Sequence, residues 1–205
     1  MNKRLILLLL LWAFLGLSGA VAVAESLFLD NSDAVYCREL GSGAVVVLMY
    51  HGLDAEHNFD PADFEAQMQH LADNNYSTLT LDELQSWITS GQPALPEKPV
   101  VLTFDDNYLS IYTVAYPTLQ SHGFTGVNFT HTNYVGVVTS FDHADWDEIN
   151  EMETAGVIFT ESHTKSHPNL TALTDPQITE ELAGSKAAIE ANIPGKTCKH
   201  LAYPY

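Results

Sequence analysis

Two short stretches of the chain carry the side chains best suited to chemistry. The first is Asp105-Asp106, a pair of adjacent carboxylates that directly follows the apolar run at residues 99–104. Burying carboxylates beside a core is costly unless a partner compensates them. Because side chains alternate faces along a strand, one carboxylate could hold a metal while the other stays free as a base. The structural alternative is that the pair caps the next helix, since Asp is common at N-caps and in first turns.

The second stretch is the segment SHTKSHP at residues 162–168, which contains His163 and His167. A spacing of four residues puts both on one face of a helix, but Pro168 disfavours a helical backbone at His167, so we expect a turn after a strand. Two imidazoles and one carboxylate form a three-ligand site that suits Zn²⁺ or a similar first-row metal, with a position left for water. A lone histidine pair is more often structural, so the strand-end carboxylates are what favour a metal.

Apolar runs predict strands over residues 44–50, 99–105, 125–130 and 157–160, with a last short one at 200–203. Helical patterns lie between these runs. They begin with N-cap signals at Asp60, Thr80, Asp145 and Thr174, and one more spans residues 109–121, where Pro117 either kinks the helix or marks its start. The expected inward-facing side chains include Phe64, Met68, Leu71, Leu84, Trp87, Ile88, Ile149 and Met152.

Strands that alternate with helices predict a parallel sheet with crossover helices. In parallel α/β barrels the working groups lie at the carboxyl ends of the strands. His51, Asp105-Asp106 and His163 each directly follow a predicted strand. We therefore expect these side chains to gather at one edge of the sheet.

The N-terminus has the features of an export signal. Lys3 and Arg4 precede a nearly continuous apolar stretch at residues 5–17, and Ala22-Val23-Ala24 matches a small-x-small cleavage pattern. We predict a signal peptide at residues 1–24, a lead-in at 25–43 and one domain at 44–205. The protein would then be exported, to the periplasm, the cell envelope or the extracellular space. No later stretch is long and apolar enough to span a membrane.

The chain is strongly acidic, with 26 acidic and 8 basic residues. Cleavage after Ala24 removes two basic residues, which leaves 8 − 2 = 6 basic against 26 acidic groups, a formal charge of −20. Such a surface repels nucleic acid and anionic lipid. Cys37 and Cys198 match no zinc knuckle, and export permits either a disulfide between them or two thiols.

Several motifs in order carry a family resemblance. They are TFDD at 103–106, SHTKSHPNL at 162–170 and LAYPY at 201–205, supported by LMYH at 48–51, AYP at 115–117 and GSK at 184–186. Together they resemble the polysaccharide deacetylase family, carbohydrate esterase family four, from residue 44 to the end. The resemblance implies a distorted (β/α) barrel with fewer than eight strands. It also implies an incomplete C-terminus, because the third motif normally continues past Tyr205 and the family's general-acid histidine comes later.

The resemblance also implies a role for each matched residue. Asp105 would be the catalytic base, and Asp106, His163 and His167 would hold a divalent metal, most often Zn²⁺. Tyr205 would donate its backbone N–H to the oxyanion. The implied reaction is hydrolysis of an N-acetyl group by a metal-activated water. Asn107 stands where the family usually has Gly, and Asn tolerates left-handed backbone angles better than most residues.

Two further residues are candidates for binding the substrate. Tyr108, just past the carboxylates, could stack on a sugar ring, and His51 could line the cleft or orient a neighbour. The predicted partner is an N-acetylated hexosamine polysaccharide of the poly-N-acetylglucosamine, peptidoglycan or chitin type. The alternatives are a non-catalytic carbohydrate-binding or scaffold domain that keeps the metal site, and an O-acetyl xylan esterase. Asp105 favours an enzyme, because a binding module has no need of a carboxylate beside the metal. The sequence carries no signal for the oligomeric state.

Overall fold

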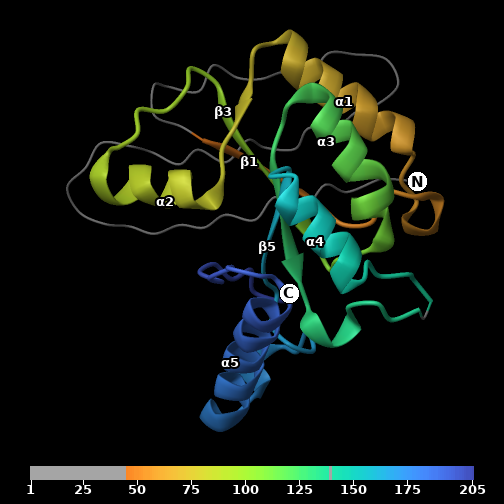
Figure 1. Cartoon of the computed structure of the whole chain (residues 1–205), viewed down its shortest axis with the longest axis vertical. Coiled ribbons are helices and arrows are strands. Elements are labelled where there is room, and N and C mark those ends of the chain that lie inside the picture. Colours follow the sequence, from red (N-terminus) through yellow and green to blue (C-terminus); the bar gives the residue numbers. More distant parts are fainter. Residues whose placement is uncertain (1–44, 139) are drawn as a thin grey trace.

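The computed structural model describes residues 45–138 and 140–205 of the 205-residue chain (Figure 1). The predicted signal peptide and lead-in, residues 1–24 and 25–43, lie outside the described residues, as does Cys37. The other cysteine, Cys198, is buried. Within the described part of the chain, no helix has the length and apolar character that a membrane span needs.

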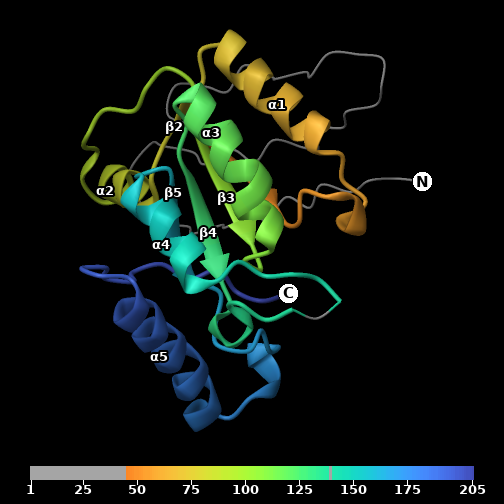
Figure 2. The same cartoon turned by 45° about the vertical axis from the view of Figure 1, so that its right-hand side comes forward.

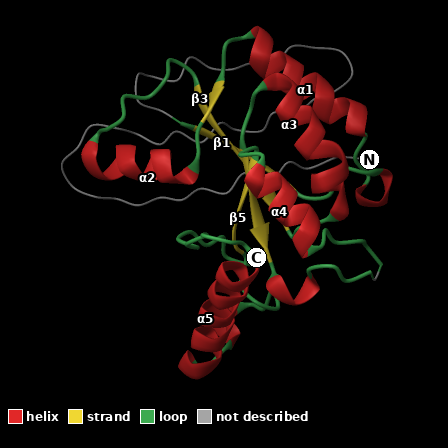
Figure 3. Ribbon diagram, in the orientation of Figure 1, coloured by secondary structure: helices red, strands yellow, loops and turns green. Residues whose placement is uncertain are grey.

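A parallel sheet forms the centre of the molecule (Figure 3). Its strands are β1 (Val46–Tyr50), β2 (Ser77–Thr78), β3 (Pro99–Asp105), β4 (Gly126–Thr130) and β5 (Ile158–Ser162). The strand order is β1-β3-β4-β5, with β2 also paired to β3, and every pairing is parallel. The expected α/β class is confirmed. Among the described residues the sheet stays open, so the barrel is not closed.

Helices connect the strands, as the alternating pattern predicted. Within the described residues they are α1 (Pro61–Asp73), α2 (Leu81–Ser90), α3 (Tyr116–His122), α4 (Trp146–Thr154) and α5 (Asp175–Asn192). A π-helical segment, Ile111–Ala115, precedes α3, and short 3₁₀ turns span Ala55–His57, Thr132–Tyr134 and Leu170–Ala172. In Figure 1, α1, α3 and α4 lie on one side of the sheet and α2 lies apart from them. Figure 2 shows α1 and α3 side by side in front of the sheet.

The central strand β3 is buried along its whole length and packs on both faces. Leu102 and Phe104 belong to the large apolar cluster that contains the core residues of α1, α3 and α4. Val101 points to the opposite face, where it packs in a smaller cluster with Leu84 and Trp87 of α2. The strand that carries Asp105 is therefore fixed from both sides by apolar burial.

Most of the predicted N-cap signals lie at the starts of helices. Asp60 caps α1 with Pro61 in its first turn, and Thr80 forms a capping box with Glu83. Pro117 lies in the first turn of α3, but the backbone before it is already helical, because the π-helical segment Ile111–Ala115 runs directly into α3.

Two predictions differ from the structure. Ile88 is 55% exposed, because Leu84 and Trp87 already fill the contact between α2 and the sheet. The strand expected at 200–203 is reduced to one parallel bridge between Leu201 and Ser162. Its physical cause is Glu161, whose Oε2 accepts the backbone N–H groups of Lys199 and His200 at 2.8 and 2.9 Å.

Glu161 ties the last segment to β5. The side chain is 7% exposed, and its second oxygen lies 3.5 Å from the ammonium of Lys196, which also contacts Glu153 at 2.7 Å. Next to it, the Ala202 N–H donates to the Ser162 carbonyl at 3.0 Å. Glu161 thus holds residues 199–202 beside the end of β5.

Replacing Glu161 with Ala should lower the free energy of unfolding by about 1–3 kcal/mol, because two half-buried backbone N–H groups lose their acceptor. Chemical denaturation of both proteins measures the difference. Glu180→Ala is the matched control, since that carboxylate is exposed and pairs only with the Lys165 ammonium. Equal, small effects for the two variants would show that Glu161 is not an anchor.

Candidate metal and active site

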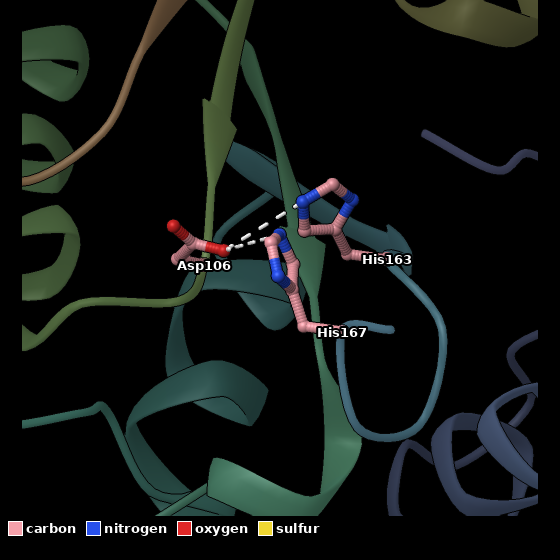
Figure 4. Close-up of side chains that lie close together, drawn as sticks. All are labelled: Asp106, His163 and His167. Atoms are coloured by element: carbon pink, nitrogen blue, oxygen red, sulfur yellow. Dashed lines mark ion pairs between the residues drawn. The ribbon is translucent and has the colours of Figure 1, made fainter. Parts of the chain in front are cut away.

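The side chain of Asp106 lies at the centre of a group of imidazoles (Figure 4). Its Oδ1 is 3.6 Å from Nε2 of His163 and 3.5 Å from Nε2 of His167. These three ligand atoms all lie within 4.8 Å of one another. The structure therefore brings together the three side chains that the sequence assigned to a metal, from the ends of β3 and β5.

The geometry of this cluster fits a metal better than a set of hydrogen bonds. Asp106 Oδ1 is buried and has no hydrogen-bond partner among the described residues. Two ligands held about 2.0–2.1 Å from a tetrahedral metal lie about 3.3–3.4 Å apart, close to the distances seen here. Two imidazole nitrogens and one carboxylate oxygen are also donors that first-row divalent metals prefer. The residues present thus fit a divalent ion.

A backbone carbonyl fixes the orientation of His163. Its Nδ1 lies 3.0 Å from the carbonyl oxygen of Ala202, which can only accept, so Nδ1 carries the proton. The lone pair of Nε2 then faces Asp106. Burial lowers the pKa of His163, which keeps the ring neutral, as a metal ligand must be. The segment anchored by Glu161 therefore also sets the tautomer of a candidate ligand.

The loop that carries His167 is held by α5. The His167 N–H donates to Thr164 Oγ1 at 3.0 Å. One carboxylate, Glu181 of α5, accepts from the backbone N–H groups of Lys165 and Ser166 and from the Ser166 hydroxyl, at 2.6–2.9 Å. Sequence reasoning missed Glu181, because nothing in a helical pattern shows that an acidic residue faces a loop. The loop is a turn after β5, as Pro168 predicted.

Left-handed backbone angles concentrate at this site. Of the seven non-glycine residues with positive φ in the described chain, five belong to it: Asp106, Asn107, Thr164, His167 and Tyr205. Such angles are costly outside glycine and persist where surrounding contacts enforce them. The expected left-handed tolerance at Asn107 is confirmed by its φ of 55°.

The contacts that hold the turn after β3 come from Asn107. Its side chain is fully buried, donates to the Ala144 carbonyl at 2.8 Å and accepts from the Asn128 amide at 2.6 Å. These bonds join the end of β3 to β4 and to the loop before α4. A glycine could adopt the same angles but could not make these bonds, so Asn107 adds a rigid support beside Asp106.

Asp105 lies in a different environment from Asp106. It is 6% exposed at the end of β3, and burial, followed by the charge of Asp106, raises its pKa to about 7. It is not part of the set of mutually close ligand atoms. The two carboxylates thus differ in surroundings, which agrees with the expectation of two separate jobs.

The remaining predicted residues lie around the same centre. His51 is exposed after β1, within electrostatic range of Asp106 and His167. Tyr108 is half-buried, and its ring packs against His57 at 4.1 Å between centroids. Burial, the charge of Asp106 and a hydrogen bond to its carboxylate raise the pKa of Tyr108 to about 12. The ring of Tyr205 lies 4.9 Å from that of His167.

One residue at the site was not predicted. His131 directly follows β4, and its Nε2 lies 3.5 Å from Asp106 Oδ1. It could have been found by the rule that selected His51 and His163, a histidine directly after a predicted strand. Burial lowers the pKa of His131, so this ring is also neutral.

Two curated proteins show what this sequence is similar to. YxkH of Bacillus subtilis (strain 168), named as a polysaccharide deacetylase, is 33% identical over 177 residues, which cover 85% of this chain and 61% of that protein. The poly-beta-1,6-N-acetyl-D-glucosamine N-deacetylase of Staphylococcus aureus (strain MRSA252) is 28% identical over 73% of this chain and 54% of its own length. The chain thus spans between half and two thirds of these relatives.

The fold has a matching solved structure. IcaB from Ammonifex degensii aligns with a TM-score of 0.70 and 26% identity, over 78% of this chain and 74% of that one. The sequence profile of the family described as polysaccharide deacetylase matches residues 92–205. That range contains Asp105, Asp106, His163, His167 and Tyr205. On these matches and on the open α/β sheet, the chain belongs to the polysaccharide deacetylase family.

Proposed function

We propose that this chain carries the catalytic centre of a metal-dependent N-deacetylase that acts on a hexosamine polysaccharide. The observation that carries the proposal is the cluster of Asp106, His163 and the half-buried His167, with a second, buried carboxylate, Asp105, on the adjacent residue. The name of the S. aureus relative supports poly-N-acetylglucosamine as the polymer. Peptidoglycan and chitin carry the same N-acetyl group and are the closest other substrates.

Asp106 Oδ1 and the Nε2 atoms of His163 and His167 would hold a divalent metal, with Zn²⁺ our first choice. When bound there, such a metal polarises the acetamide carbonyl and makes water a nucleophile near neutral pH. Ala202 keeps the proton of His163 on Nδ1, and Glu181 keeps His167 in place. These supports fix the ligand atoms before the metal arrives.

The chain's own groups would then move protons and stabilise charge. The Asp105 carboxylate takes the proton from the attacking water, and a cation nearby favours its ionised form. The backbone N–H of Tyr205 donates to the oxygen of the former carbonyl, where negative charge develops. The carbon–nitrogen bond then breaks, acetate leaves, and the amine of the sugar takes up the proton that Asp105 removed from the water.

We also propose that the protein acts outside the cytoplasm. Residues 1–24 have the pattern of a cleavable export signal. A polymer substrate at the cell envelope or beyond would agree with this, and so would an acidic surface that repels nucleic acid.

Release of acetate tests the reaction directly. Protein expressed from the full reading frame should release acetate from β-1,6-linked N-acetylglucosamine oligomers with Zn²⁺, and none with excess chelator. Asp105→Asn should lower the rate by about 10²–10⁴-fold, the range for loss of a general base. The exposed Asp73→Asn is the matched control and should keep the full rate. Activity that survives in Asp105→Asn would contradict the assignment of the base.

The same assay tests the competing functions. Acetylated xylan, β-1,4-linked oligomers and peptidoglycan fragments are run in parallel under identical conditions. Faster release from acetylated xylan would make the protein an O-esterase. Tight Zn²⁺ binding with no release from any of these substrates would favour a non-catalytic binding domain.

The raised pKa of Asp105 predicts a pH-dependent stability. An unfolded Asp titrates near pH 3.8, and burial with the nearby Asp106 charge moves the folded value to about 7. The folded state therefore binds the proton more tightly, so stability falls as pH rises from about 4 to 7 and is constant above. In metal-free protein, Asp105→Asn should remove this fall and raise stability by a few kcal/mol above pH 7, since one pKa unit is worth about 1.4 kcal/mol.

Urea denaturation at several pH values, with chelator present, measures this effect. The exposed Asp73→Asn serves again as the control and should follow the wild-type profile. A destabilised Asp105→Asn at pH 8 would show that the ionised carboxylate is compensated in the folded protein.

A further inference from the structure

His131 makes the same contact with Asp106 as the two sequence-predicted histidines. Its Nε2 lies 3.5 Å from Asp106 Oδ1, against 3.6 Å for His163 and 3.5 Å for His167. Its side chain is 7% exposed and comes from the end of β4, between the strands that carry the other two sides of the site. Three imidazole nitrogens thus surround a single carboxylate oxygen.

Hydrogen bonding does not explain this arrangement. Asp106 Oδ1 has no hydrogen-bond partner among the described residues, so His131 does not donate to it. The other ring nitrogen, Nδ1 of His131, is also buried without a partner in the described chain. Unpaired buried polar atoms are costly, and a cation between Oδ1 and Nε2 would compensate the first of them.

In the described part of the chain, the contacts of the His131 ring are with other rings and with the Asp106 carboxylate. Tyr134 contacts it edge-on at 4.6 Å between centroids, and His143 and His167 lie at 5.2 and 5.8 Å. His163, by contrast, is locked by its hydrogen bond to Ala202. The ring of His131 can therefore turn toward an ion without breaking a hydrogen bond.

We propose that His131 is a fourth protein ligand of the divalent metal, in addition to Asp106, His163 and His167. The proposal rests on the metal site of the proposed function. His131 Nε2 lies as near to Asp106 Oδ1 as the other two nitrogens, but it is outside the set of ligand atoms that are all within 4.8 Å of one another. To bind the same ion, its ring would have to turn toward the other ligands. Its nitrogen would add a third imidazole and reduce the open positions left to water and substrate.

His143 supplies a matched control. It neighbours His131 and is nearly as buried, but its Nδ1 faces the Val137 carbonyl at 3.1 Å. Replacement of either histidine by Phe keeps an aromatic ring in place. Of the two, only His131→Phe should change the metal site.

The first measurement is metal binding, with no activity assay involved. Zn²⁺ affinity is determined by competition with a chromogenic chelator, and Co²⁺ substitution reports the ligand set through its visible absorption. His131→Phe should weaken Zn²⁺ binding at least about tenfold, because even loss of a group supporting a ligand costs about 10–100-fold. It should also change the Co²⁺ spectrum, whereas His143→Phe should change neither. Equal affinity and an unchanged spectrum in His131→Phe would overturn the proposal.

The second measurement uses the wild-type protein, so it does not depend on a variant that folds. Side-chain ¹⁵N NMR of the histidines during Zn²⁺ addition should show the Nε2 signals of His131, His163 and His167 shifting together. A shift of His163 and His167 without His131 would overturn the fourth ligand and leave the proposed function intact. No shift of any of the three would overturn the metal-dependent function itself, and the fourth ligand with it.

Discussion

The site depends on one constraint, the burial of the Asp106 carboxylate among imidazole rings. A carboxylate oxygen with no hydrogen-bond donor is unfavourable inside a protein, and among the described residues Asp106 Oδ1 has none. Three ring nitrogens lie 3.5–3.6 Å from it. Burial lowers the pKa of His131 and His163, so these rings do not neutralise the charge by protonation. The divalent cation that we propose would compensate this charge, and the fold holds the carboxylate in place for it.

The surrounding fold acts as the support for this arrangement. Apolar packing on both faces fixes β3 up to Asp105, and the buried side chain of Asn107 locks the turn that follows. Two carboxylates on other elements hold the histidine side of the site. Glu181 of α5 fixes the loop before His167, and Glu161 anchors the segment whose Ala202 carbonyl orients His163. Residues far apart in sequence thus converge on a few ligand atoms.

The sequence predicted the sheet and its helices, because apolar runs and capping signals are local features. The family resemblance selected Asp106, His163 and His167, whose ligand atoms the structure brings close together. It could not show contacts that depend on how distant elements meet. Ile88 follows the helical period of α2, yet the sheet below is already covered by its neighbours. The segment at 200–203 resembles a strand, but the Glu161 carboxylate accepts the N–H groups of Lys199 and His200, and one bridge to β5 remains. His131 also directly follows a predicted strand, as His51 and His163 do. Only its distance from Asp106 in the structure shows that it lies at the site.

The most direct test of the metal centre is anomalous X-ray diffraction at the zinc absorption edge, from crystals grown with Zn²⁺. The arrangement described here predicts one strong peak between Asp106 Oδ1 and the Nε2 atoms of His163 and His167. Asp105 should lie beside the ion without ligating it. A crystal with no peak at this position, or with Zn²⁺ bound by Asp105 in place of Asp106, would contradict the separate roles assigned to the two carboxylates.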